Sequence, residues 1–293
     1  MKYNKSSISN TTIEYAFRHI LLQELKSINQ WRKVAIKAKD PEGVHQIRIS
    51  LRRIRTALQV FKPIINTKFS QTLTKKLKTC ATVLDHARDL DVYILMHFAD
   101  DTESTIKSAV ISKRNKAYLR VKKLLKSKQF NKLIRSSKKW VKTGQWQKRV
   151  IRHKKLNNSL KSFAFDTLGA MTNVIIIKGL HPEQLDDVAL HKLRIDCKKL
   201  RYTTEFFISL YDETMIKAFI DKLKQLQDSL GDIHDCFIQK KLHLRLLQKN
   251  KKMHLTLVSQ QVLLQIDRTA ESKKSQLCKE LATFCHSESP WQA

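Results

Sequence analysis

The sequence predicts an all-α protein made of two tandem helical bundles related by internal pseudo-twofold symmetry. Only five glycines and four prolines occur among 293 residues, which is few for a sheet-rich fold with many tight turns. Apolar residues recur every three or four positions over long stretches, the spacing of helices with one buried face. The pattern of residues 45–61 returns at residues 191–207, an offset of 146 residues. A repeat of this length is too long for a solenoid unit and indicates a duplicated bundle.

The first half begins with two predicted helices. Residues 10–39 carry the apolar spacing of a long amphipathic helix. A second helix is expected over residues 45–61. Pro41 suits its first turn and Glu42 suits its positive N-terminal end, whereas the residue before Pro63 disfavours helix and should end it. The core side chains predicted for the first helix are Ile13, Phe17, Ile20, Leu21, Leu25 and Ile28.

A third helix is expected over residues 69–98, followed by a turn at residues 100–103. Its predicted core residues are Leu73, Leu77, Cys80, Val83, Leu84, Val92 and Leu95. Residues 106–165 then contain twenty Lys and Arg and no acidic residue, with helical apolar spacing and a predicted break at residues 143–145. This basic run is either a solvated helical face or a surface for a polyanion, and the sequence leaves both open.

The second half repeats this order of helices. The apolar spacing of its first helix, expected to start near residue 156, is carried by Phe163, Leu168, Met171 and Val174. The helices that follow are predicted over residues 191–207, 215–247 and 255–284.

The predicted domain spans residues 10–286. Its first repeat covers about residues 10–143 and its second about residues 147–286, matching the offset between the two motif helices. Residues 287–293 are expected to form a frayed tail, as chain ends commonly do.

The charge balance points to an anionic partner. The chain carries 57 Lys and Arg against 26 Asp and Glu, a formal charge of +31, and such an excess attracts nucleic acid, polyphosphate or an acidic membrane surface. No apolar run approaches the roughly 18 residues of a membrane span, and no secretory signal is apparent. The five cysteines form no CxxC pair, which favours a reducing compartment and a cytoplasmic location. The oligomeric state is left open.

The helix over residues 45–61 has two opposed faces. At about 100° per residue, one arc holds the apolar side chains Ile47, Leu51, Ile54, Leu58 and Phe61. The opposite arc holds the basic side chains His45, Arg48, Arg52 and Arg55, while Arg53 lies about 100° off this stripe. No acidic residue occurs between Gly43 and Leu84, so no local partner is expected for the stripe. The matching residues of the second half are His191, Arg194, Lys198, Lys199 and Arg201.

The residue types argue against catalysis and against a metal site. The sequence contains no glycine-rich phosphate loop and no GxSxG motif, so no catalytic residue and no cofactor is predicted. Guanidinium groups surround His45 and His191 and disfavour a cation there. The pairs His86 with Asp89 and Asp232 with Asp235 are too few ligands for a metal. Each motif histidine is either a structural residue near its helix start or a ligand contact.

The composition of the stripes favours a ligand made of phosphate. Arg offers a planar fork for two oxygens, Lys a mobile charge, and a His beside a polyanion gains basicity. Neither basic face carries an aromatic side chain on which a nucleobase would stack.

The two motif segments, PEGVHQIRISLRRIR and LHKLRIDCKKLRY, are each followed by an acidic segment, LDHARDLDV and LGDIHDCFI. This duplicated pattern resembles the CHAD family, the conserved histidine α-helical domain, over nearly the whole chain. The resemblance implies two bundles around a central basic channel that binds inorganic polyphosphate without catalysis, and a location at polyphosphate granules. The alternatives are a polyphosphate- or triphosphate-processing enzyme and a non-specific nucleic-acid binder using residues 107–161.

The resemblance also implies which residues contact phosphate. In the two motif helices these are His45, Arg48, Arg52, Arg53, Arg55, His191, Arg194, Lys198, Lys199 and Arg201. A second tier, from the helices that follow, consists of Lys76, Lys78, Lys222 and Lys224. The second half departs from the first where His234 matches Arg88 and Gly231 matches Asp85, which puts the role of these later helices in doubt.

Overall fold

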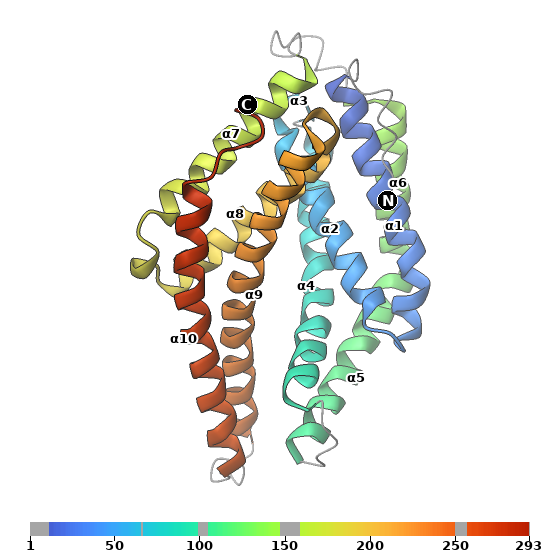
Figure 1. The fold of residues 1–293 in the computed structure, drawn as a ribbon. Helices are drawn as coiled ribbons and strands as arrows, with labels where there is room; N and C mark the ends of the chain where they lie inside the picture. Colours follow the sequence, from blue (N-terminus) through green and yellow to red (C-terminus); the bar gives the residue numbers. More distant parts are fainter. Residues whose placement is uncertain (1–11, 66, 99–104, 147–158, 250–256, 293) are drawn as a thin grey trace. The chain divides into compact units, whose positions relative to one another are not determined.

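The computed structural model describes residues 12–65, 67–98, 105–146, 159–249 and 257–292. These residues are all helical or in turns, without a strand, and divide into two compact units (Figure 1). The first unit contains α1 (Ile13–Lys37), α2 (Glu42–Val60), α3 (Lys62–Ile65), α4 (Lys68–His97), α5 (Thr105–Lys126) and α6 (Lys128–Thr143). The second contains α7 (Leu160–Gly179), η4 (Pro182–Gln184), α8 (Asp187–Phe206), η5 (Ile208–Leu210), α9 (Glu213–Lys249) and α10 (Leu257–Cys285).

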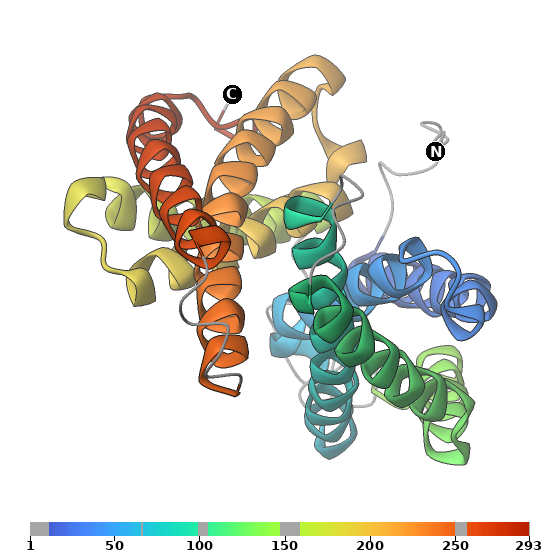
Figure 2. The same cartoon turned by 90° about the horizontal axis from the view of Figure 1, so that it is seen from below.

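The long helices of the first unit pack side by side, with α1 along α2 and both α5 and α6 against α1 (Figures 1 and 2). Helix α1 starts after Thr12, whose side chain accepts a hydrogen bond from the backbone N–H of Tyr15 and so caps the helix. The six side chains predicted for its core are all buried, so this prediction is confirmed. The backbones of α1 and α2 meet at Gly43, where a Cβ would lie 2.4 Å from the backbone nitrogen of Ala35.

Helix α4 lies where the sequence predicted a third helix, but part of its predicted core is wrong. Leu73, Leu77 and Leu84 are buried, whereas Leu95 near its end is 67 % exposed. Val83 and Val92 are also only partly buried. The apolar period continues past the point where neighbouring helices cover the α4 surface. The predicted turn at residues 100–103 lies outside the described residues.

The described residues of the basic run form α5, α6 and the start of α7. The predicted break at residues 143–145 is confirmed, because α6 ends at Thr143 and Gly144 takes a left-handed conformation with φ of 63°, which glycine adopts without strain. The rings of Trp140 and Trp146 pack edge-on against Phe17 of α1 and bring this basic segment into the core of the unit.

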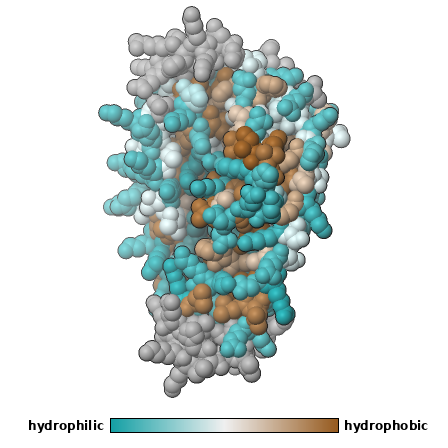
Figure 3. Space-filling view, turned by 90° about the vertical axis from the view of Figure 1, so that its left-hand side faces the viewer, coloured by the Kyte–Doolittle hydropathy of each residue, from teal (hydrophilic) through white to brown (hydrophobic). Residues whose placement is uncertain are grey.

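In the second unit, α9 and α10 pack along each other and α8 packs on α9. Helix α7 is apolar but unevenly covered: Leu168 is buried, while Val174 is 42 % and Ile177 is 68 % exposed. Val174 belongs to the apolar spacing that predicted this helix, but it does not lie in the core. Figure 3 shows apolar side chains gathered among hydrophilic ones on one face of the molecule. By length and composition alone α7 would pass as a membrane span. The predicted helix start near residue 156 lies outside the described residues.

The C-terminal tail is ordered against the second unit, so the prediction of a frayed end is wrong. Trp291 is only 5 % exposed. Its ring packs edge-on against Phe219 of α9, with ring centroids 4.7 Å apart, and also contacts Tyr211. Burial of one large aromatic side chain holds a segment that was expected to fray because it is a chain end.

Candidate functional site

The two faces predicted for α2 are present in the structure. Ile47, Leu51 and Ile54 are almost completely buried in the first unit. The basic side chains on the opposite side are intermediate in exposure, so each reaches solvent while its stem is packed. We call His45, Arg48, Arg52 and Arg55 the α2 stripe. We call the matching residues His191, Arg194, Lys198 and Arg201 the α8 stripe.

Asp85 of α4 orients one arginine of the α2 stripe. The Nε of Arg48 donates a hydrogen bond to Asp85 Oδ1 at 2.6 Å. No local acidic partner was expected for the stripe, and Asp85 is a partner that is far in sequence but adjacent in space. A carboxylate held on one edge of the guanidinium fixes its plane and leaves the terminal nitrogens available for an anion.

Arg52 and Arg55 have no acidic partner among the described residues. The Nε of Arg55 is buried and meets no hydrogen-bond acceptor in the described part of the chain. Burial lowers the pKa of Arg55, and the neighbouring charge of Arg52 adds to this effect while Asp85 opposes it. A partly desolvated guanidinium beside a second cation is a group that an incoming anion would stabilise.

His45 stands at the start of the α2 stripe. Its Nδ1 is buried and meets no hydrogen-bond partner among the described residues. Burial lowers its pKa below the ordinary 6.5, with Arg88 next in effect, and the charges of Arg48 and Arg52 act in the same direction. Glu42 opposes this shift. The free protein therefore holds His45 mainly neutral near pH 7, and added negative charge would favour its protonation.

Arg53, which was predicted as a phosphate contact, points to a different neighbour. Its Nε donates to Glu24 Oε1 of α1 at 2.5 Å, and the Glu24 side chain is only 9 % exposed. This ion pair fastens α2 to α1. The lysines of the second tier, Lys76 and Lys78, are exposed on α4.

The α8 stripe has different neighbours. The Nδ1 atoms of His191 and His234 lie 3.4 Å apart with ring centroids separated by 4.9 Å, so α8 and α9 meet there through two imidazoles. Burial lowers the pKa of His191, and the charges of Arg194 and Lys198 lower it further. Arg201 Nε donates to Gln227 Oε1 at 2.9 Å.

The remaining predicted residues of the second unit are partly occupied by acidic neighbours. Lys199 lies 3.4 Å from Asp196 of its own helix, and Asp196 also binds Lys178 of α7. Lys224 pairs with Asp221, three residues earlier on α9, while Lys222 is partly buried. Sequence spacing could have predicted these local pairs.

The structure groups four stripe residues on each motif helix and leaves Arg53 and Lys199 on other sides. Phosphate contact by any of these residues stays a prediction. Glu24, Asp85 and Gln227 were not identified from the sequence, because each meets its arginine across a long stretch of chain. In the described part of the chain, no group of three or more His, Cys, Asp or Glu gathers where it could hold a metal ion.

Comparisons with known proteins agree with this architecture. The family model of the CHAD domain matches residues 19–244. The crystal structure of the CHAD domain from the plant Ricinus communis superposes with a TM-score of 0.83 at 20 % identity, over 99 % of this chain and 98 % of that chain. PptA from Streptomyces chartreusis gives 0.62 at 13 % identity, over 94 % of this chain and 100 % of that chain. At these identities the likeness concerns the fold alone. No curated protein matches the sequence.

Proposed function

The chain belongs to the CHAD domain family, and on that basis we propose that it binds inorganic polyphosphate through the α2 stripe and the α8 stripe. The observation that carries this proposal is the unneutralised part of the α2 stripe. Arg52 and Arg55 form no ion pair among the described residues, and the Arg55 Nε is buried without an acceptor there, although the charge of Asp85 still acts on Arg55. Such cations cost stability unless an anion meets them.

The chemistry of binding follows from the side chains. The exposed edges of Arg48 and Arg52 can each hold two phosphate oxygens in parallel, and Lys198 supplies a mobile charge on the other helix. Binding releases the counterions of the polyanion, so affinity should fall steeply with salt. A longer chain offers phosphates to both stripes, so affinity should also rise with chain length. The predicted central channel stays a prediction.

The proposed activity is binding without turnover, in the cytoplasm and at polyphosphate granules. The alternative of a processing enzyme is tested by incubating labelled polyphosphate with the protein and Mg²⁺ or Mn²⁺. Release of shorter chains or phosphate would replace the binding proposal by an enzymatic one. Co-localisation of the tagged protein with stained granules tests the proposed location, and diffuse fluorescence in cells with granules would contradict it.

The main test is a competition titration with long-chain polyphosphate, RNA and duplex DNA. The stripe variant replaces Arg48, Arg52, Arg194 and Lys198 by Ala. Its matched control removes four exposed lysines elsewhere in both units, namely Lys122, Lys123, Lys241 and Lys279. At about 1 kcal/mol for each lost charged contact, the stripe variant should bind polyphosphate about 100- to 1000-fold more weakly.

The control variant tests whether polyphosphate binds at the stripes or responds only to the net charge of the protein. It should bind polyphosphate within a few-fold of the parent, because it loses the same net charge but no stripe residue. Equal weakening of both variants would mean that only net charge matters. Unchanged binding by the stripe variant would place the ligand elsewhere. Tighter binding of RNA or DNA than of polyphosphate would favour a nucleic-acid binder.

A further inference from the structure

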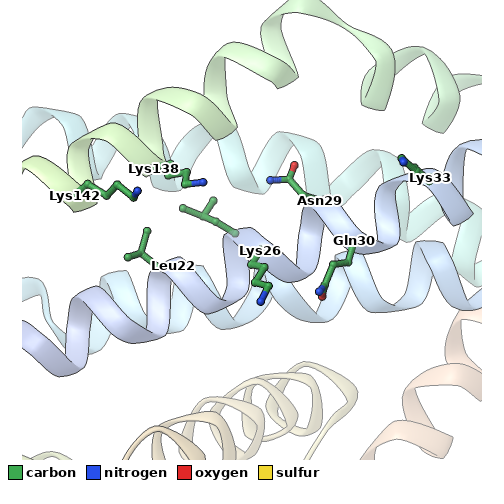
Figure 4. Close-up of a pocket in the computed structure, with 8 residues that line it drawn as sticks. Leu22, Lys26, Asn29, Gln30, Lys33, Lys138 and Lys142 are labelled. Carbon is green, nitrogen blue, oxygen red and sulfur yellow. The ribbon is translucent and has the colours of Figure 1, made fainter.

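A second cationic surface lies in the first unit, on helices that carry neither stripe. It is a groove of about 650 Å³ between α1 and α6, which is within the size range of small-molecule sites (Figure 4). Its lining residues are Leu22, Leu25, Lys26, Asn29, Gln30, Lys33, Lys138 and Lys142.

Two arginines of α1 hold α6 in place on either side of the groove. A terminal nitrogen of Arg18 donates to the backbone carbonyl of Lys142 at 3.0 Å. Fourteen residues along α1, Arg32 donates to the side-chain oxygen of Asn131 at 2.7 Å and lies over the ring of Phe130. The two helices therefore run antiparallel, and the groove is bracketed by contacts that do not depend on its lysines.

The groove is positively charged and has no acidic side chain in its lining. Lys138 and Lys142 extend from α6 over the space, while Lys26 and Lys33 lie along α1 (Figure 4). All four lysines are exposed, and α6 contains no Asp or Glu. Lysines from both helices beside one small space favour a compact ligand with several negative charges.

The floor of the groove offers apolar contacts and hydrogen bonds in addition to positive charge. Leu25 is buried and Leu22 partly so, and together they give the site an apolar surface. Asn29 projects from α1 toward α6, and Gln30 stands at the outer rim (Figure 4). Carboxamides both donate and accept hydrogen bonds. Inorganic polyphosphate can accept hydrogen bonds from the carboxamide N–H groups, but it has no apolar face for the leucines and no donor for the carboxamide oxygen.

We propose that this groove binds a nucleoside triphosphate. The base lies against Leu22 and Leu25, its polar edge meets the carboxamide of Asn29, and the triphosphate is held by the lysines. This site differs from the stripes in its helices, its lysine-only cations and its apolar floor. It gives the basic run of α6 a role separate from polyphosphate binding.

The test measures binding of ATP to the full chain by calorimetry, with inorganic tripolyphosphate as a ligand of similar charge without a base. ATP should bind more tightly than tripolyphosphate. The double variant Lys138→Gln, Lys142→Gln should weaken ATP binding about tenfold or more. The matched control Lys132→Gln, Lys139→Gln removes two exposed α6 lysines that do not line the groove, and should leave ATP binding unchanged.

A second variant separates base recognition from charge. Asn29→Ala should weaken ATP binding several-fold while leaving tripolyphosphate binding unchanged. The proposal is overturned if tripolyphosphate binds as tightly as ATP, if both α6 variants lose ATP equally, or if ATP does not bind. The stripe variant should keep ATP binding. If the stripe variant loses polyphosphate binding and retains ATP binding, the groove and the stripes are independent sites.

Discussion

Helices α2 and α8 carry matching cations but neutralise them by different means. In α2 the off-stripe Arg53 reaches a buried carboxylate on the neighbouring helix, Glu24. In α8 the matching Lys199 meets Asp196, three residues earlier on the same helix. Both halves therefore provide an acidic partner at the off-stripe position. The off-stripe position thus serves helix packing in one unit and local charge balance in the other. Stripe residues have acidic neighbours too, since Arg48 pairs with Asp85 and Arg201 with Glu205.

The helices that precede the motif helices differ as well. Gly43 allows the α1 and α2 backbones to approach closely, and the residue at the matching position of α8 is Ala189. Helices α7 and α8 lack a comparably long interface among the described residues. One contact between them is the ion pair of Lys178 with Asp196. The first unit thus has a close backbone contact at Gly43, whereas an ion pair joins the corresponding helices of the second unit.

The largest expected effect is on the backbone contact at Gly43. Gly43→Ala places a methyl group against backbone atoms of Ala35 and Val34 at 2.4 to 2.9 Å, which neither helix can relieve without shifting. We expect a loss of about 3 kcal/mol in the free energy of unfolding, measured by urea denaturation. Ala189→Gly at the matching position should cost about 1 kcal/mol through helix propensity alone. Equal losses would contradict the contrast between the units.

A smaller effect is expected at the off-stripe cations. Arg53→Ala leaves the carboxylate of Glu24 almost buried and without this arginine, so unfolding should become easier by about 2 kcal/mol. Lys199→Ala should cost less than about 1 kcal/mol, because its pair is more exposed and Lys178 still binds Asp196. Denaturation of both variants measures the difference.

A second substitution that removes the charge of Glu24 provides the control for Arg53→Ala. The double variant Arg53→Ala, Glu24→Gln should recover part of the lost stability, since it no longer buries a charge. If Arg53→Ala is as mild as Lys199→Ala, the ion pair does not fasten α1 to α2. Polyphosphate affinity should change little in either single variant, and a large loss would return these residues to the binding site.

Periodicity was enough to predict the helices, the all-α class and the opposed faces of α2, since those properties are set within one helix. The CHAD family was implied by the resemblance of the duplicated motif segments. Periodicity failed to predict burial and ion pairs that depend on which other helix packs against the one in question. Leu95 and Val174 continue an apolar pattern that nothing covers in the described structure. The partners Glu24 and Asp85, and the groove between α1 and α6, join segments far apart in sequence, so spacing carried no signal for them.

The smallest expected effect is the pH dependence of polyphosphate affinity, which compares the histidines of the two stripes. The pKa values of His45 and His191 are both lowered from 6.5, chiefly by burial and then by nearby cations. A bound polyanion raises these pKa values, so binding takes up protons between the free and bound values. Polyphosphate affinity should therefore rise several-fold as pH falls from 8 to 6. Titrations at constant ionic strength measure this dependence.

The variant His45→Gln, His191→Gln should flatten this pH profile while keeping most of the affinity at pH 8, where both imidazoles are neutral.

The same pKa shifts make the folding stability of the free protein decrease as pH falls. A neutral histidine whose folded pKa is lowered contributes stability above pH 6.5, and this contribution is lost as pH falls toward the folded value. Acid should therefore weaken the free protein while it strengthens the complex. His45 is the more buried of the two, and its single variant should remove more of the pH dependence than that of His191. An unchanged profile in the double variant would assign both histidines a purely structural role.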